Sequence, residues 1–211
     1  ASPGYYRAKQ IIRFIIALSK LIDSNPRARE FLKVVFVENY DVSSAEVLIP
    51  ATDLSEQLST ASKEASGIGT MDGANVEMSE RVGLDNIYIF GMRSDTVRDM
   101  YREHTYSPMG IFESNGELRK ALTQLIDGTM NGLILQDLYH SLLMGDPGHL
   151  PDNYFVIKDF GSYSMAQRRV NADYADKDKW LRMAILNTAM AGFFSSDRTI
   201  AEYEKDIWRL K

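Results

Sequence analysis

The 211-residue sequence contains no cysteine. Disulfides, thiolate metal sites and a cysteine nucleophile are therefore excluded, and the absence is typical of a protein from a reducing compartment. Basic residues are also in the minority, with 24 Lys and Arg against 29 Asp and Glu, which gives a formal net charge of -5. An acidic chain repels nucleic acid and anionic membrane surfaces, so we expect neither as a partner.

Long hydrophobic runs are also lacking. The longest run near the N-terminus, from Ile11 to Ile22, is interrupted by Arg13, Ser19 and Lys20, whereas a membrane-spanning helix needs about 20 predominantly apolar residues in succession. We therefore expect a soluble, cytoplasmic protein. Hydrophobic residues make up 45% of the chain, which is enough for a substantial core in one large domain or two small ones.

The first half of the chain has the pattern of an α/β fold. Apolar residues repeat at helical spacing from Tyr5 to Asp23, which predicts an amphipathic helix. The run from Leu32 to Tyr40 is rich in valine and aromatic residues, as in a strand buried on both faces of a parallel sheet. Ser43 and Glu46 form a capping-box pattern for a short helix, and a second strand is predicted from Asn86 to Met92.

The second half of the chain is predicted to be mainly helical. We therefore interpret the chain as a single partial domain, with an α/β sheet portion over residues 1–93 and a helical portion over 94–211 packed on it. The expected helices cover Ser94–Glu103, Ser114–Ile126, Leu133–Met144, Met165–Ala175, Trp180–Ala191 and Ile200–Arg209. Ser114 with Glu117 is the expected cap of the second of these helices.

A small-molecule site is expected where the first strand ends. In open α/β sheets ligands bind outside the carboxyl ends of the strands, and this strand leads into Glu38, Asn39, Tyr40 and Asp41. The alternative is that these are ordinary turn residues, with Asn39 and Asp41 bonded to local backbone.

The stretch Gly67–Gly73 is rich in glycine but matches neither common phosphate-binding pattern. Its third glycine falls one position late for a dinucleotide fingerprint, and the Gly-Lys-Ser/Thr ending of a P-loop is missing. It is either a loop with a tight turn or a set of backbone amides that hold hydroxyls or phosphates. The three histidines, His104, His140 and His149, have no metal-ligand spacing, and we expect His140 to be a surface or hydrogen-bonded residue.

Five blocks of this sequence closely resemble the α-glucan phosphorylases, which act on glycogen, starch or maltodextrin. They occur in the family's order along essentially the whole chain, and their specificity is high. The blocks are Ser2–Lys9, Val34–Gly67, Ile68–Met78, Ile87–Met92 and Phe194–Trp208.

The resemblance implies a fold, a reaction and a cofactor. The expected fold is part of the C-terminal Rossmann-like domain of a GT-B glycosyltransferase, followed by a helix-rich C-terminal region. The family transfers a terminal α-1,4-linked glucosyl unit to inorganic phosphate, giving glucose 1-phosphate, with pyridoxal phosphate as cofactor. The resemblance also implies a homodimer and an allosteric enzyme whose regulatory sites involve the N-terminal domain.

The resemblance also assigns roles to particular residues. It implies that Glu64, with the backbone amides of Ser66 and Gly67, binds hydroxyls of the transferred glucosyl unit. A carboxylate accepts such O–H bonds strongly, and glycine permits a close approach of the backbone. Tyr40 matches the family tyrosine that lies beside the cofactor.

The sequence departs from the family pattern directly after Gly67. There the family continues with T-G-N-M-K, which holds the cofactor lysine and amides that help to bind phosphate, whereas here Ile68 follows. Lys63 precedes Glu64 and does not substitute for that lysine; we expect it to be solvated. The family's N-terminal domain, which forms the other wall of the cleft, is also absent from the sequence.

Two origins can explain the segment that is missing after Gly67, and three hypotheses about function remain. Either the molecule has an active-site segment that the sequence omits, which we favour, or the polypeptide is a truncated and deleted variant. The leading hypothesis is a pyridoxal-phosphate-dependent phosphorylase seen as a fragment that is inactive alone. The alternatives are a non-catalytic fragment with only packing or glucan-binding capacity, and a nucleotide-sugar glycosyltransferase of the same fold, against which the EASG and GTMDGANVE blocks argue.

Overall fold

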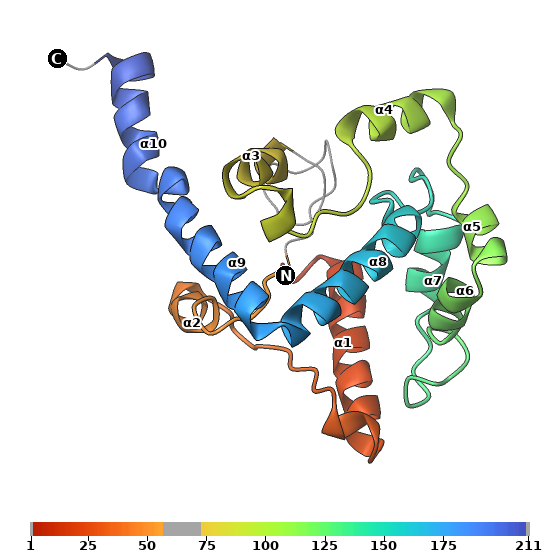
Figure 1. The fold of residues 1–211 in the computed structure, drawn as a ribbon. Coiled ribbons are helices and arrows are strands. Elements are labelled where there is room, and N and C mark those ends of the chain that lie inside the picture. Colours follow the sequence, from red (N-terminus) through yellow and green to blue (C-terminus); the bar gives the residue numbers. More distant parts are fainter. Residues whose placement is uncertain (1, 57–72, 210–211) are drawn as a thin grey trace. The chain divides into compact units, whose positions relative to one another are not determined.

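The computed structural model describes residues 2–56 and 73–209, and the elements in these two ranges are helices (Figure 1). Contacts divide the chain into two compact units. The first unit comprises residues 1–55 and 104–160, and the second comprises residues 56–103 and 161–211. The predicted division at residue 93 does not coincide with these units and stays a prediction.

The first unit is built from short helices around one long N-terminal helix. Helices α5 and α6 contact each other, and α7 contacts both α5 and α1. The elements are α1 (Tyr6–Ser24), η1 (Ala28–Glu30), α2 (Val42–Leu48), α5 (Pro108–Ser114), α6 (Gly116–Thr123), α7 (Gln136–Leu143) and the first residues of α8 (Val156–Ala175).

Two groups of buried side chains form the core of the first unit. One group joins α6, α7 and the start of α8 through Leu118, Leu143 and Ile157. The other contains Leu125, Leu135 and Leu138, and Phe14 of α1 packs against it. The apolar stripe of α1 therefore covers the α7 region, as the helical spacing of its sequence requires.

The second unit contains the remaining helices. Helix α9 contacts α3, η2 and η3, and the buried apolar residues include Val82, Ile87, Val97, Val170 and Met183. The elements are α3 (Gly73–Val82), η2 (Leu84–Asn86), α4 (Ser94–Glu103), most of α8, α9 (Lys177–Met190), η3 (Ala191–Phe194), α10 (Ser196–Glu202) and η4 (Tyr203–Trp208), the last a π-helix.

Most of the predicted helices that fall on described residues are confirmed, with shifted ends. The N-terminal helix was predicted from Tyr5 to Asp23 and runs from Tyr6 to Ser24. Helix α8 begins at Val156, nine residues before the predicted start at Met165. Helix α5 was not predicted from the sequence; Ser107 caps it and Pro108 occupies its first position.

Two predicted N-caps are wrong by one or two residues. The carboxylate of Asp41, not Ser43, accepts the N–H of Ser44 at the start of α2. The amide of Asn115, not Ser114, accepts the N–H of Leu118 at the start of α6. Both residues are strong capping types, and they reach the third N–H of the helix with their own backbone outside it.

Neither predicted strand is a strand in the structure. Residues 33–37 are neither helical nor paired, and Asn86 belongs to the 3-10 turn η2. A strand requires a neighbouring strand to satisfy its backbone N–H and C=O groups. Val35 of the first run is 66% exposed, and Phe36 and Val37 are also exposed, so this part of the run is not buried as a central strand would be. The α/β fold class therefore stays a prediction.

Candidate functional site

The expected ligand edge at Tyr40 is an exposed turn that leads into α2. Tyr40 is 58% exposed, and Asn39 before it adopts a left-handed conformation with φ of 52°. Asparagine tolerates this conformation better than most residues. The predicted cofactor-binding role of Tyr40 thus falls on an accessible side chain, and the role itself stays a prediction.

Asp41 has a structural role at this edge. Its Oδ1 accepts hydrogen bonds from the backbone N–H and from the hydroxyl of Ser44, each at 2.8 Å. These bonds stabilise the carboxylate and lower the pKa of Asp41 below its ordinary value. The interpretation of Asp41 as a residue that satisfies local backbone is therefore confirmed.

The residues predicted to bind the glucosyl unit lie outside the described residues. This holds for Glu64, Ser66 and Gly67, for the neighbouring Lys63, and for Gly67–Asp72 of the glycine-rich stretch. Their assignments stay predictions. Gly73, the last residue of that stretch, begins helix α3.

The described residues contain no group of three or more His, Asp or Glu side chains arranged to hold a metal ion. The Nε2 atom of His140 lies 2.6 Å from the Nε2 of Gln136 one helical turn earlier. His140 is thus half-buried and hydrogen-bonded, which confirms the second of the two predicted alternatives. In the same ranges, no helix has the length and apolar character needed to cross a membrane.

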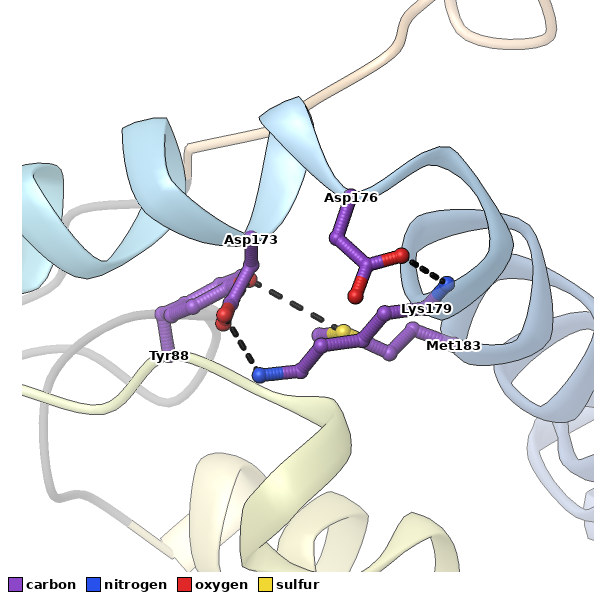
Figure 2. Close-up of polar contacts among 5 residues, drawn as sticks. All are labelled: Tyr88, Asp173, Asp176, Lys179 and Met183. Carbon is purple, nitrogen blue, oxygen red and sulfur yellow. Dashed lines mark hydrogen bonds and ion pairs between the residues drawn. The ribbon is translucent and has the colours of Figure 1, made fainter.

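A polar cluster of the second unit lies at the corner between α8 and α9 (Figure 2). The carboxylate of Asp173 accepts a hydrogen bond from the hydroxyl of Tyr88 at 2.8 Å and forms an ion pair with the ammonium of Lys179. The Tyr88 hydroxyl also lies 3.8 Å from the sulfur of Met183. Asp176 caps α9 by accepting the backbone N–H of Lys179 at 3.1 Å.

The charges of this corner explain the shifted pKa values. Hydrogen bonding to Lys179, followed by the bond from Tyr88, lowers the pKa of Asp173 below its ordinary value. Burial, together with the adjacent Asp173 carboxylate, raises the pKa of Tyr88 well above its ordinary value. Asp173 is thus ionised and Tyr88 neutral at neutral pH. An ionised carboxylate that already binds an ammonium, beside a neutral phenol, favours a structural link over proton transfer.

Aromatic rings complete the corner. Tyr88 stacks on Trp180 with centroids 6.4 Å apart, and Tyr174 meets Trp180 edge-on at 5.0 Å. The Lys177 ammonium lies 3.4 Å from the centroid of the Tyr174 ring. Sequence reasoning missed this cluster because Tyr88 is 85 positions away from Asp173.

A buried carboxylate lies shortly before the start of α8, in the first unit. Asp152 is 3% exposed and accepts the backbone N–H of Val156 at 2.9 Å and of Ile157 at 2.8 Å. It also accepts the hydroxyl of Tyr106, whose pKa is raised above its ordinary value by burial and by Asp152. The Tyr106 ring lies 4.8 Å from the ring of Phe155. Asp152 therefore holds the start of α8 in place.

Comparison with known proteins identifies the family of the chain. The carbohydrate phosphorylase family matches residues 1–210. The chain is 45% identical to the glycogen phosphorylase of Bacillus subtilis, 41% identical to the maltodextrin phosphorylase of Streptococcus pneumoniae, and 42% identical to the muscle form of human glycogen phosphorylase.

The coverage of these alignments is unequal. They include 100%, 100% and 99% of this chain but only 28%, 29% and 26% of the respective relatives, so the chain spans somewhat more than a quarter of their length. The first two alignments run over 226 and 231 positions, which exceeds the 211 residues of this chain. The relatives therefore have residues inside the aligned region that have no counterpart here. The match over residues 1–210 shows that the chain belongs to the carbohydrate phosphorylase family.

Proposed function

We propose that this chain is part of an α-glucan phosphorylase, which transfers a terminal glucosyl unit from an α-1,4-glucan to inorganic phosphate and releases glucose 1-phosphate. The observation that carries the proposal is the family match over residues 1–210, together with relatives named glycogen and maltodextrin phosphorylase. Because the chain spans less than a third of those relatives, the activity belongs to a longer polypeptide or assembly.

Within that reaction we assign this chain the recognition of the transferred glucosyl unit. Glu64 accepts sugar hydroxyls, and the backbone amides of Ser66 and Gly67 donate to the same unit. These contacts contribute to catalysis by holding the reacting carbon in position, which is worth more when the site is closed and preorganised. Glu64→Gln in the full-length enzyme is expected to weaken glucan binding, and unchanged phosphorolysis with normal affinity would contradict the role.

The residues of this chain fit the family's cofactor only in part. Pyridoxal phosphate supplies a phosphate group that donates and accepts a proton in this family. Tyr40 is exposed and accessible to a cofactor, but after Lys63 the next lysine in the sequence is Lys120. No residue here matches the lysine that holds the cofactor aldehyde, so we derive no step through the cofactor for this chain.

A second candidate is a non-catalytic fragment that retains packing or glucan-binding capacity. It is favoured by the direct succession of Gly67 and Ile68, where the family has its cofactor lysine block, and by alignments longer than the chain. The intact mass and the pyridoxal-phosphate absorbance of the purified protein separate the two candidates. A mass well above 23.9 kDa with bound cofactor supports the enzyme; a mass matching the sequence, without cofactor, supports the fragment.

A hybrid enzyme tests the function directly. This chain replaces the aligned 28% of the Bacillus subtilis glycogen phosphorylase, either as it stands or with the relative's additional residues restored between Gly67 and Ile68. We expect glucose 1-phosphate from the restored hybrid only. Activity of both hybrids would refute the importance of the gap, and inactivity of both, beside an active unsubstituted relative, would refute the proposed enzyme.

A further inference from the structure

The segment from Phe31 to Ile49 in the first unit is rich in exposed apolar side chains. It runs from just after η1 to the C-cap of α2 (Figure 1). Single apolar residues are common on protein surfaces, whereas large contiguous apolar patches mark interaction sites. We call residues 31–49 the exposed segment. Ten of its large apolar side chains are at least 37% exposed: Phe31, Leu32, Val35, Phe36, Val37, Tyr40, Val42, Val47, Leu48 and Ile49.

Helix α2, in the second half of the exposed segment, has no buried residue. Its apolar residues Val42 and Val47 are 76% and 70% exposed. A helix of 7 residues is shorter than the roughly 12–15 residues at which isolated helices become even marginally stable in water. The Asp41 cap satisfies the backbone N–H of Ser44 but buries no apolar surface. Helix α2 therefore needs packing that the described part of the chain does not supply.

The first half of the exposed segment has the composition of a strand that is covered on both faces. Its β-branched and aromatic residues are the types enriched in strands, although residues 33–37 form no strand in the structure. In an extended chain successive side chains point to opposite faces. Val35 and Val37 would then lie on one face, and Val34 and Phe36 on the other. Because both pairs are apolar, both faces of such a strand require cover.

The valine run is already held at one end. Ser19 of α1 donates its hydroxyl to the carbonyl oxygen of Val34 at 2.7 Å, and Val34 is half-buried. The next residue, Val35, is 66% exposed. The run is thus attached to α1 at Val34, while the residues that follow are accessible to another segment of polypeptide.

The two-sided apolar character of the run restricts the kind of partner. A membrane surface would cover one face only. A second copy of the run would give a two-stranded ribbon, which is marginally stable in water and leaves both faces without cover. The curated relatives have nearly three quarters of their length outside the alignments with this chain. A polypeptide of that size can supply both the neighbouring strands and the layers that cover them.

We propose that the exposed segment is an interface with the rest of the phosphorylase polypeptide. Residues 34–37 pair as a β-strand with a strand from outside this chain, and α2 packs against the sheet so formed. This inference rests on the proposed function, because it requires the longer polypeptide or assembly to which the activity is assigned. The addition of a strand satisfies backbone N–H and C=O groups and buries apolar side chains in one step.

Backbone hydrogen exchange of residues 34–37 tests the interface. We compare the 211-residue chain with the restored hybrid by mass spectrometry of peptides that cover this run. The amides are expected to exchange at least about 100-fold more slowly in the hybrid, because there they open only together with the sheet. Equal exchange in the two proteins would overturn the proposal. Protection already present in the isolated chain would assign the cover to this chain itself, or to a second copy if it is lost on dilution, and would overturn it too.

Val35→Lys tests whether the run is buried in the complete protein. Because Val35 is 66% exposed in the isolated chain, the change is expected to move the melting temperature of that chain by no more than about 2 °C. In the restored hybrid the same change would bury an unpaired charge, so it is expected to abolish the protection of residues 34–37. Val35→Ile is the matched control, since it keeps a β-branched apolar side chain and is expected to keep the protection. A Val35→Lys hybrid that retains the protection would contradict the interface.

The outcomes separate this inference from the function on which it rests. A folded restored hybrid that protects residues 34–37 but releases no glucose 1-phosphate supports the interface and refutes the proposed function. An active hybrid in which these amides exchange as fast as in the isolated chain supports the function and refutes the interface. A restored hybrid that does not fold, beside a folded unsubstituted relative, shows that the exposed segment does not fit the remaining polypeptide and also refutes the interface.

Discussion

Replacement of Asp152 by asparagine is expected to be among the more damaging conservative changes in this chain. The side chain is 3% exposed, and its two oxygens receive three donors. Oδ1 accepts the N–H of Val156, while Oδ2 accepts the N–H of Ile157 and the hydroxyl of Tyr106. Asn has the same shape, but one of its two terminal groups donates where the carboxylate only accepts.

The amide cannot serve all three donors in either orientation. If its NH₂ group takes the place of Oδ1, it faces the N–H of Val156; if it takes the place of Oδ2, it faces the N–H of Ile157. At least one hydrogen bond to a charged group is lost, which costs about 1.5–3 kcal/mol. Asp152 has φ of 44°, and asparagine tolerates this conformation, so the change isolates the hydrogen bonds from backbone strain.

Urea unfolding followed by circular dichroism measures this loss. For a chain of this length, a loss of about 1.5–3 kcal/mol in unfolding free energy lowers the melting temperature by about 3–12 °C. Tyr106→Phe keeps the ring beside Phe155 and both backbone hydrogen bonds to Asp152, and it removes one hydrogen bond to the same carboxylate, so it is expected to cost a similar amount, about 1.5–3 kcal/mol. Asp41→Asn alters an exposed cap of equal capping strength and is expected to change the stability least of the three. An Asp152→Asn variant as stable as wild type would refute the reasoning.

Two further predictions concern a tight turn and a pH-dependent contact. Gly145→Ala is expected to lower the free energy of unfolding more than Gly148→Ala. Both glycines have φ near 80°, a conformation that costs a residue with a side chain about 1–2 kcal/mol. A Cβ at Gly145 would also lie 2.6 Å from the His149 carbonyl oxygen, whereas a Cβ at Gly148 would meet nothing within 4 Å. Equal costs would contradict this. Lys179→Met is expected to destabilise the protein at neutral pH. Because Lys179 lowers the folded-state pKa of Asp173 below its ordinary 3.8, the stability that their contact contributes is present above the ordinary pKa and is lost as pH falls through the lowered one. Urea midpoints of variant and wild type should therefore converge in strong acid, and a constant difference at every pH would contradict the prediction.

Local sequence was a reliable guide where a few neighbouring residues decide the structure. The apolar spacing of α1 predicted that helix to within one residue at each end. At the starts of α2 and α6 several capping residues compete within a few positions, and the predicted caps at Ser43 and Ser114 were wrong. The choice depends on which backbone N–H each side chain reaches, which periodicity does not specify.

The two predicted strands depended on partners elsewhere in the chain. A buried strand is stable only beside neighbours that pair with its backbone. The run from Leu32 to Tyr40 has the composition of such a strand, but residues 33–37 form no strand in the structure. The composition of the run suits a buried strand, but the strands that would pair with it have to come from other segments of the chain.

The sequence by itself determined the family of this protein, because long blocks of specific residues identify a relative without any reference to space. It also determined most helices of the second half, since helical hydrogen bonds join residues four positions apart. Only the tertiary structure decided that Tyr88 meets Asp173, that Tyr106 meets Asp152, and that Glu56 and Gly91 are held by the same stretch of α8. These partners lie tens of positions apart, and no local pattern in the chain encodes which of them pack together.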